Sequence, residues 1–125
     1  MRKHHSQMNE EEIKAVESFV RNNSFEINSS HSLEEMSDEG ITADQVDDVL
    51  AHGNVVEVCN HDATGSLRIL IRKTVGDFDV CVVVGVRDRV IVTTWRNDTG
   101  DDHPSLKKQP YSWKVNLKDL LTQLQ

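Results

Sequence analysis

The sequence lacks the features that mark disulfide-stapled, membrane-spanning or secreted chains. It holds only two cysteines, Cys59 and Cys81, and no apolar run approaches the roughly 18 residues of a membrane span. The basic start, residues 1–5, is followed by no apolar stretch and therefore does not match a signal peptide. These absences predict a cytoplasmic protein that makes no membrane contact and keeps two buried free thiols.

Positive charge is scarce in the first part of the chain. Residues 1–52 hold four Lys/Arg and twelve Asp/Glu, whereas residues 53–125 hold ten and nine, and the formal net charge is −7. An acidic half repels a polyanion. The acidic charge of the chain argues against non-specific binding along nucleic acid, but it is compatible with one local phosphate site in residues 53–125.

Motifs for a metal or a cofactor are missing as well. No Cys/His spacing fits zinc, and the aspartates at 98, 101 and 102 lack the Gly and terminal Glu of a calcium loop. There is no Gly-rich phosphate motif and no nucleophile elbow. The sequence implies no metal and no cofactor.

What is present centres on Val80–Val84, which is apolar at every position and suits a strand covered on both faces. Strands are predicted at 54–59, 67–73, 79–84 and 90–95. The short links between them indicate an antiparallel meander, because parallel neighbours need long crossovers. The prediction is an α+β fold in which N-terminal helices pack on a four-stranded antiparallel sheet.

Start and stop signals predict the helices. Asn9 with Glu12, Ser32 with Glu35, and Thr42 with Gln45 each form a capping-box pattern, and glycines at 40 and 53 end the second and third helices. A short C-terminal helix is expected from residue 116. Residues 1–8 are predicted to be disordered. Residues 9–125 form one domain, with a helix over 9–23, a core over 25–96 and a loop and helix over 97–125.

The core resembles a bacterial family catalogued as domain of unknown function 4258. That family has a His-small start, a Met, a Gly-Ile-(Ser/Thr) step, a helix ending in Leu-x-x-Gly, and a meander ending near a Thr-aromatic pair. The matching residues here are His31-Ser32, Met36, Gly40-Ile41-Thr42, Leu50-Ala51-His52-Gly53 and Thr94-Trp95. The tail, with Trp95-Arg96-Asn97, Asp101-Asp102-His103 and Tyr111-Ser112-Trp113, resembles the ending of toxin-like members.

This resemblance implies a function. The family is usually grouped with the barnase-like, colicin-like and RelE-like nucleases, which cut RNA without metal. It therefore implies a toxin-like, metal-independent endoribonuclease, with RNA as substrate and a cognate antitoxin or immunity protein as partner. Two positions depart from the family, because Glu35 and Glu39 stand where it often has arginine. They motivate the alternative of a catalytically inactive relative that serves as a protein-binding module.

Ribonuclease chemistry assigns roles to eight residues. Cleavage at a 2′-hydroxyl needs a base, an acid and cations for the phosphate. Imidazole titrates near neutral pH, so the two histidines are the base and acid candidates, and guanidinium groups bind phosphate bidentately. The candidates are His31 and His103 for proton transfer, Arg68, Arg72 and Arg96 for phosphate, Thr94 as a hydrogen-bond donor, and Tyr111 or Trp95 for base stacking.

Each candidate also has a structural interpretation. His31 suits a helix start, His103 suits an exposed turn, and Arg68 and Arg72 suit a sheet face paired with acidic neighbours. Trp95 suits core packing. A third interpretation is that the acidic half mimics nucleic acid in a toxin-neutralising partner. The sequence leaves these alternatives open.

Overall fold

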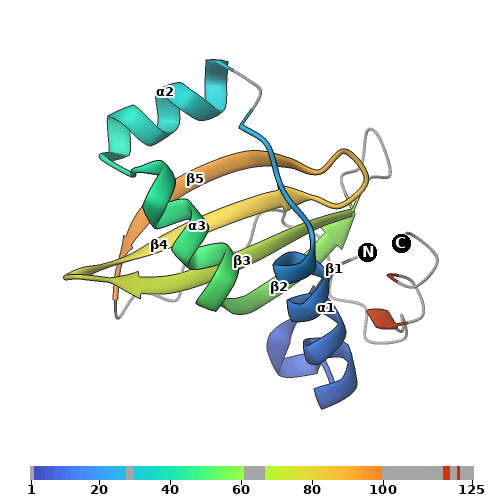
Figure 1. The fold of residues 1–125 in the computed structure, drawn as a ribbon. Coiled ribbons are helices and arrows are strands. Elements are labelled where there is room, and N and C mark those ends of the chain that lie inside the picture. The colour runs from blue at the N-terminus through green and yellow to red at the C-terminus, as the bar shows by residue number, and fades with distance from the viewer. Residues whose placement is uncertain (1, 28–29, 61–66, 100–116, 119–120, 122–125) are drawn as a thin grey trace.

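The computed structural model describes residues 2–27, 30–60, 67–99, 117–118 and 121. The elements are β1 (Arg2–His4), the 3-10 helix η1 (His5–Gln7), α1 (Glu10–Asn22), α2 (Ser30–Glu39), α3 (Ala43–His52), β2 (Asn54–Asn60), β3 (Leu67–Val75), β4 (Phe78–Gly85) and β5 (Val90–Asp98). The strands form one antiparallel sheet in the order β1-β2-β3-β4-β5, with the α-helices on one side of it (Figure 1). The predicted α+β class and the meander from β2 to β5 are confirmed.

The helices begin and end largely where the capping signals predict. Asn9 Oδ1 accepts from the Glu12 N–H at 2.8 Å and starts α1, and Thr42 caps α3 in the same way. Gly40 takes a positive φ of 68° after α2, a conformation that glycine adopts without steric cost. The predicted start of α2 is wrong, because the helix already begins at Ser30 and Ser32 bonds to β5 instead of capping it.

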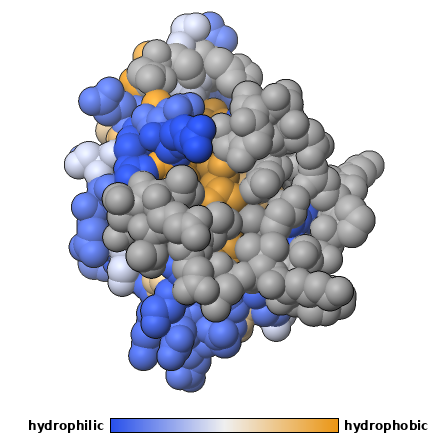
Figure 2. Space-filling view, turned by 90° about the vertical axis from the view of Figure 1, so that its right-hand side faces the viewer, coloured by the Kyte–Doolittle hydropathy of each residue, from blue (hydrophilic) through white to orange (hydrophobic). Residues whose placement is uncertain are grey.

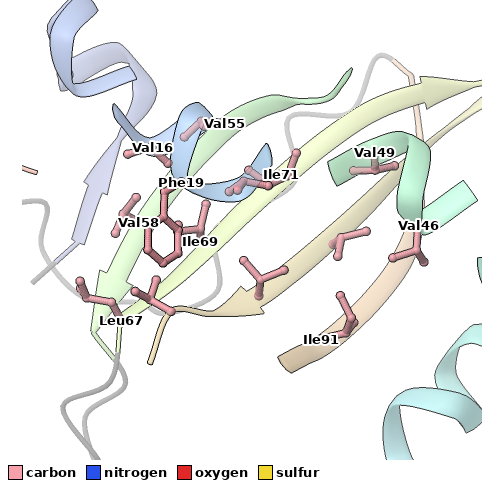
Figure 3. Close-up of a cluster of buried hydrophobic side chains, with 14 of the residues drawn as sticks. Val16, Phe19, Val46, Val49, Val55, Val58, Leu67, Ile69, Ile71 and Ile91 are labelled. Atoms are coloured by element: carbon pink, nitrogen blue, oxygen red, sulfur yellow. The ribbon is translucent and has the colours of Figure 1, made fainter. Parts of the chain in front are cut away.

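The core lies between the helices and one face of the sheet. Successive side chains of a strand point to opposite faces. Val80, Val82 and Val84 of β4 are fully buried in one cluster with residues of α1, α3 and the neighbouring strands. Figure 3 shows members of this cluster, among them Phe19 of α1, Val49 of α3 and Ile69 of β3. We call this side of the sheet the helix face.

The other side, which we call the far face, carries a second and smaller cluster. Cys81 and Val83 of β4 pack there with Leu70 of β3, and Trp95 of β5 lies against them. Cys81 and Cys59 are both buried, and neither forms a disulfide. The prediction that the central strand is covered on both sides is confirmed, since every residue from Val80 to Val84 is buried.

One side of the molecule shows mostly hydrophilic residues among those that are described (Figure 2). Figure 2 also shows apolar residues near the middle of this side. Leu33 of α2 is the one large apolar side chain that is exposed in the described part of the chain. None of the described helices is both long and apolar enough to cross a membrane.

The predicted four-stranded sheet and disordered N-terminus are wrong. Arg2–His4 adds a fifth strand, β1, which pairs with Glu57, Val58 and Cys59 of β2. Two buried ion pairs hold it. Arg2 Nε lies 2.8 Å from Glu57 Oε2, and Lys3 Nζ lies 2.7 Å from Glu12 Oε2. The partners in these ion pairs are separated in sequence, so no local sequence pattern predicts that the N-terminus is ordered.

Glu12 joins three parts of the chain. Its Oε2 accepts from Lys3 of β1 and from the Leu117 N–H at 3.0 Å, while its Oε1 accepts from the Asn9 N–H. Burial alone raises the pKa of this carboxyl, but the hydrogen bonds from Leu117, Lys3 and Asn9 outweigh burial and leave the pKa below its ordinary value. The ionised carboxylate therefore connects β1, α1 and Leu117.

The end of the chain differs in part from prediction. β5 continues to Asp98, so the loop predicted after Trp95 begins later than expected. Leu117 and Leu121 are buried in the main core. The rest of the predicted C-terminal helix and the loop over 100–116 lie outside the described residues.

We expect Glu12→Gln to lower the free energy of unfolding by about 3 kcal/mol, because it leaves the buried Lys3 ammonium without its counter-charge. Urea denaturation at neutral pH measures the loss. A carboxylate with a lowered folded-state pKa stabilises the fold above its unfolded-state value of about 4.3, and the contribution disappears as pH falls through the lower folded-state pKa. Below that pH the variant and the wild type should converge.

Glu11→Gln is the matched control. The Glu11 side chain is 75% exposed, and its ion pair with Lys118 spans 3.5 Å, so the change should cost less than about 0.5 kcal/mol. Equal losses in the two variants, or a difference that persists at acid pH, would contradict the role assigned to Glu12.

Candidate functional site

Two of the candidate residues lie on the helix face beside α2. Thr94 pairs with Val82 and Arg96 pairs with Val80 across the β4–β5 ladder, which places both on this face. The Arg96 guanidinium lies 4.3 Å from the Phe78 ring centroid, a cation–π contact, and next to Gly40 at the end of α2. Arg96 is exposed. It is the one candidate cation near α2.

Thr94 is not placed to meet a substrate. Its side chain is 1% exposed, and Oγ1 is buried with no hydrogen-bond partner among the described residues. Its backbone N–H instead donates to Glu35 of α2 at 3.4 Å. The Thr94 hydroxyl, which was predicted to donate to a substrate, is therefore buried inside the protein.

Glu35 fastens α2 to β5. Its Oε2 accepts from the Thr93 hydroxyl as well as from the Thr94 N–H. One turn earlier on the helix, the Ser32 hydroxyl donates to the Ile91 carbonyl at 3.0 Å and lies 3.1 Å from the Val92 carbonyl. Glu35 therefore has a structural role at the edge of the sheet.

Three other candidates lie on the far face. Arg68 and Arg72 of β3 are in register with Gly85 and Cys81 of β4, and Trp95 of β5 is also in register with Cys81. Strand alternation places all three on the side opposite Thr94 and Arg96. The sheet separates the predicted phosphate-binding residues into two groups.

The charge of Arg72 is neutralised within the far face. Its Nε donates to Asp79 Oδ2 at 2.5 Å and its Nη2 donates to the Asp98 carbonyl at 3.1 Å. Asp79 also accepts from the Thr74 hydroxyl at 2.6 Å. Arg68 differs, because it is half-buried and its side chain has no hydrogen bond or ion pair among the described residues.

The electrostatics of this face also act on Cys81. Burial raises the pKa of its thiol to about 11, against an opposing effect of the nearby Arg72 charge. A thiol with so high a pKa is a poor nucleophile at neutral pH. Cys81 therefore serves packing.

The remaining candidates are not placed by the described residues. His31 lies in α2, but its side chain is not described, and His103 and Tyr111 lie outside the described residues. No group of three His, Cys, Asp or Glu side chains in the described part of the chain is arranged to hold a metal ion.

A protein-family model described as "Domain of unknown function (DUF4258)" matches residues 28–96, more than half of the chain. The chain belongs to the DUF4258 family. The predicted family is thereby confirmed over nearly the range expected from the sequence, while its grouping with ribonuclease toxins stays a prediction. No curated protein and no solved structure matches this DUF4258 chain.

Sequence reasoning missed the buried pairs that organise this protein. The Arg72–Asp79 pair could have been predicted from the sequence, because the turn at Gly76 sets the register of β3 and β4 and brings the two residues close. The contacts from α2 to β5 and from Arg2 to Glu57 span more than 50 residues each and leave no local signal.

We expect Thr94→Val to leave the free energy of unfolding unchanged or to raise it by up to about 1 kcal/mol, because valine has nearly the same shape and removes a buried hydroxyl without a partner. Thr93→Val is the matched variant. It removes the hydroxyl that donates to the Glu35 carboxylate and should cost about 1.5 kcal/mol.

Chemical denaturation of both variants measures the difference. A large loss in Thr94→Val together with none in Thr93→Val would show that the assignment of the two hydroxyl groups is reversed.

Proposed function

We propose that this DUF4258 protein is a non-catalytic member of its family that works as a protein-binding module through α2 and α3. One observation carries the proposal. A ribonuclease would need α2 beside its phosphate site. Glu35 instead holds α2 on β5, and the helix contains Glu and Asp but no Lys or Arg.

The charge of this surface is one-sided. Residues 30–52, which include α2 and α3, hold seven Asp/Glu and no Lys/Arg. Two of the seven are engaged, Glu35 by β5 and Asp48 by Lys73 at 2.7 Å. The others have no ionic partner among the described residues, namely Glu34, Asp38, Glu39, Asp44 and Asp47. Such a surface repels phosphate and attracts a basic protein.

An apolar anchor lies on the same surface. Leu33 is 55% exposed and is followed directly by Glu34. Protein interfaces commonly combine an apolar contact with a polar rim. A basic partner with an apolar contact residue would satisfy both features of α2.

A second candidate function is the ribonuclease itself, placed on the far face. Arg68 favours it, since this cation has no partner among the described residues and shares its face with Arg72 and Trp95. In that case His103 and Tyr111 would have to reach the same face, and the partner would be a cognate antitoxin or immunity protein. RNA would be the substrate.

We expect the purified, folded protein to leave total RNA and tRNA intact in EDTA at neutral pH, because Arg68 and Arg72 lie across the sheet from Arg96. Gel analysis of the RNA measures cleavage. Wild type is compared with His31→Ala, His103→Ala and Arg68→Ala. Cleavage by wild type that disappears in Arg68→Ala or His103→Ala would replace the binding proposal with the far-face ribonuclease, and loss in His31→Ala alone would replace it with a ribonuclease that uses α2.

We expect a partner from an extract of the source cells to bind the wild-type protein and to be lost when Glu34 and Asp38 are both changed to Lys, because the surface then loses its acidic character. Glu10→Lys with Glu11→Lys on α1 is the control, since it changes net charge equally at another exposed place. Affinity capture and mass spectrometry identify what is retained.

Retention that is equal in both charge variants would exclude α2 as the binding surface. Loss in both would show that net charge alone drives the association, and the proposal would then fail as well.

A further inference from the structure

β5 forms one edge of the sheet, and the described residues cover only the first half of that edge. The strand order gives β5 a neighbour on the β4 side alone. Near its start, the Ile91 N–H donates to the Glu26 carbonyl at 2.8 Å, and the Ile91 carbonyl accepts from Ser32. Glu35 accepts from the Thr94 N–H. Up to Thr94, the outward backbone groups therefore have partners.

In the second half of the edge, the described residues leave most of the outward backbone groups without a partner. The β4–β5 ladder is regular from Thr93 to Asp98, after an irregularity nearer the start of β5. The Thr94 N–H points away from β4, toward Glu35, and this direction alternates along an antiparallel strand. The N–H and C=O groups of Arg96 and the N–H of Asp98 therefore also point outward, whereas the Asp98 carbonyl accepts from Arg72, which reaches it from β3 across β4.

Little in the described part of the chain occupies these groups. Arg72 Nη2 donates to the Asp98 carbonyl at 3.1 Å, and a carbonyl oxygen has a second lone pair. No other described residue bonds to the outward groups of Arg96 or Asp98. Both residues are exposed. An exposed edge of this kind is a template for another strand.

We propose that this edge pairs with the same edge of a second copy of the chain, antiparallel about a two-fold axis at Asn97. In that register Arg96 of each copy lies opposite Asp98 of the other. In each Arg96–Asp98 pair the Asp98 N–H donates to the Arg96 carbonyl, and the Arg96 N–H donates to the second lone pair of the Asp98 carbonyl, which already accepts from Arg72. The proposal is independent of the function proposed above.

Charge makes the edge complementary to itself. Arg96 and Asp98 are two residues apart, so their side chains lie on the same face, and the antiparallel partner sets each guanidinium against a carboxylate. A two-fold interface requires this kind of self-complementarity. The competing explanation is that these charges keep the edge unpaired, as edge charges often do.

Analytical ultracentrifugation of the full chain over a wide concentration range tests the proposal. Wild type should show a monomer–dimer equilibrium. Arg96→Asp and Asp98→Arg should each weaken the dimer by at least about tenfold, since each sets like charges opposite one another. The double variant Arg96→Asp/Asp98→Arg should restore an affinity near that of wild type, because the pairs are only exchanged.

Arg87→Asp is the matched control, since Arg87 is exposed in the β4–β5 turn and its reversal changes net charge by the same amount. It should leave the equilibrium unchanged. A second measurement needs no variant: exchange of the Arg96 and Asp98 amide hydrogens should slow as wild-type concentration rises.

Two outcomes overturn the proposal. A wild type that stays monomeric at all concentrations, with amide exchange independent of concentration, means that the charges protect the edge. A dimer that survives both single reversals, or that the double variant does not recover, means that association uses another surface.

Discussion

In β4, five successive side chains from Val80 to Val84 are buried, and neighbouring side chains of a strand point in opposite directions. The sheet therefore buries side chains on both of its faces. This alternation decides where every strand residue can act. It places Thr94 and Arg96 beside α2 and places Arg68 and Arg72 on the far side, although all four lie within one meander. The two groups lie on opposite faces of the sheet, so they do not form one phosphate site on either face.

The buried carboxylates of α1 and β2 stabilise the fold by holding the N-terminal strand. Glu12 binds β1, α1 and Leu117 through one carboxylate, and Glu57 holds Arg2 against β2. A buried ion pair stabilises little relative to an apolar replacement, but losing one partner is costly because a bare charge stays buried. Such pairs therefore act chiefly to hold the N-terminal strand in one register.

α2 is joined to the sheet edge by an acidic residue, Glu35. Glu35 does not face an empty cleft, because it accepts from Thr93 and Thr94 and satisfies part of an edge strand. This carboxylate joins the helix to β5. The outer surface of α2 carries acidic residues and no Lys or Arg, which is the basis for preferring a protein partner to RNA. The edge beyond Thr94, where α2 no longer reaches the strand backbone, is left for pairing.

The sequence by itself determined the elements that depend on neighbours in the chain. The capping residues Asn9 and Thr42, the turn glycine Gly40 and the apolar run Val80–Val84 act through local backbone geometry and periodicity, and the meander and the family followed from their order. The tertiary structure alone decided the fifth strand, the two groups of candidate site residues and the role of Glu35. Those features depend on contacts between residues far apart in sequence, and on which face each strand turns to the helices, neither of which leaves a local pattern.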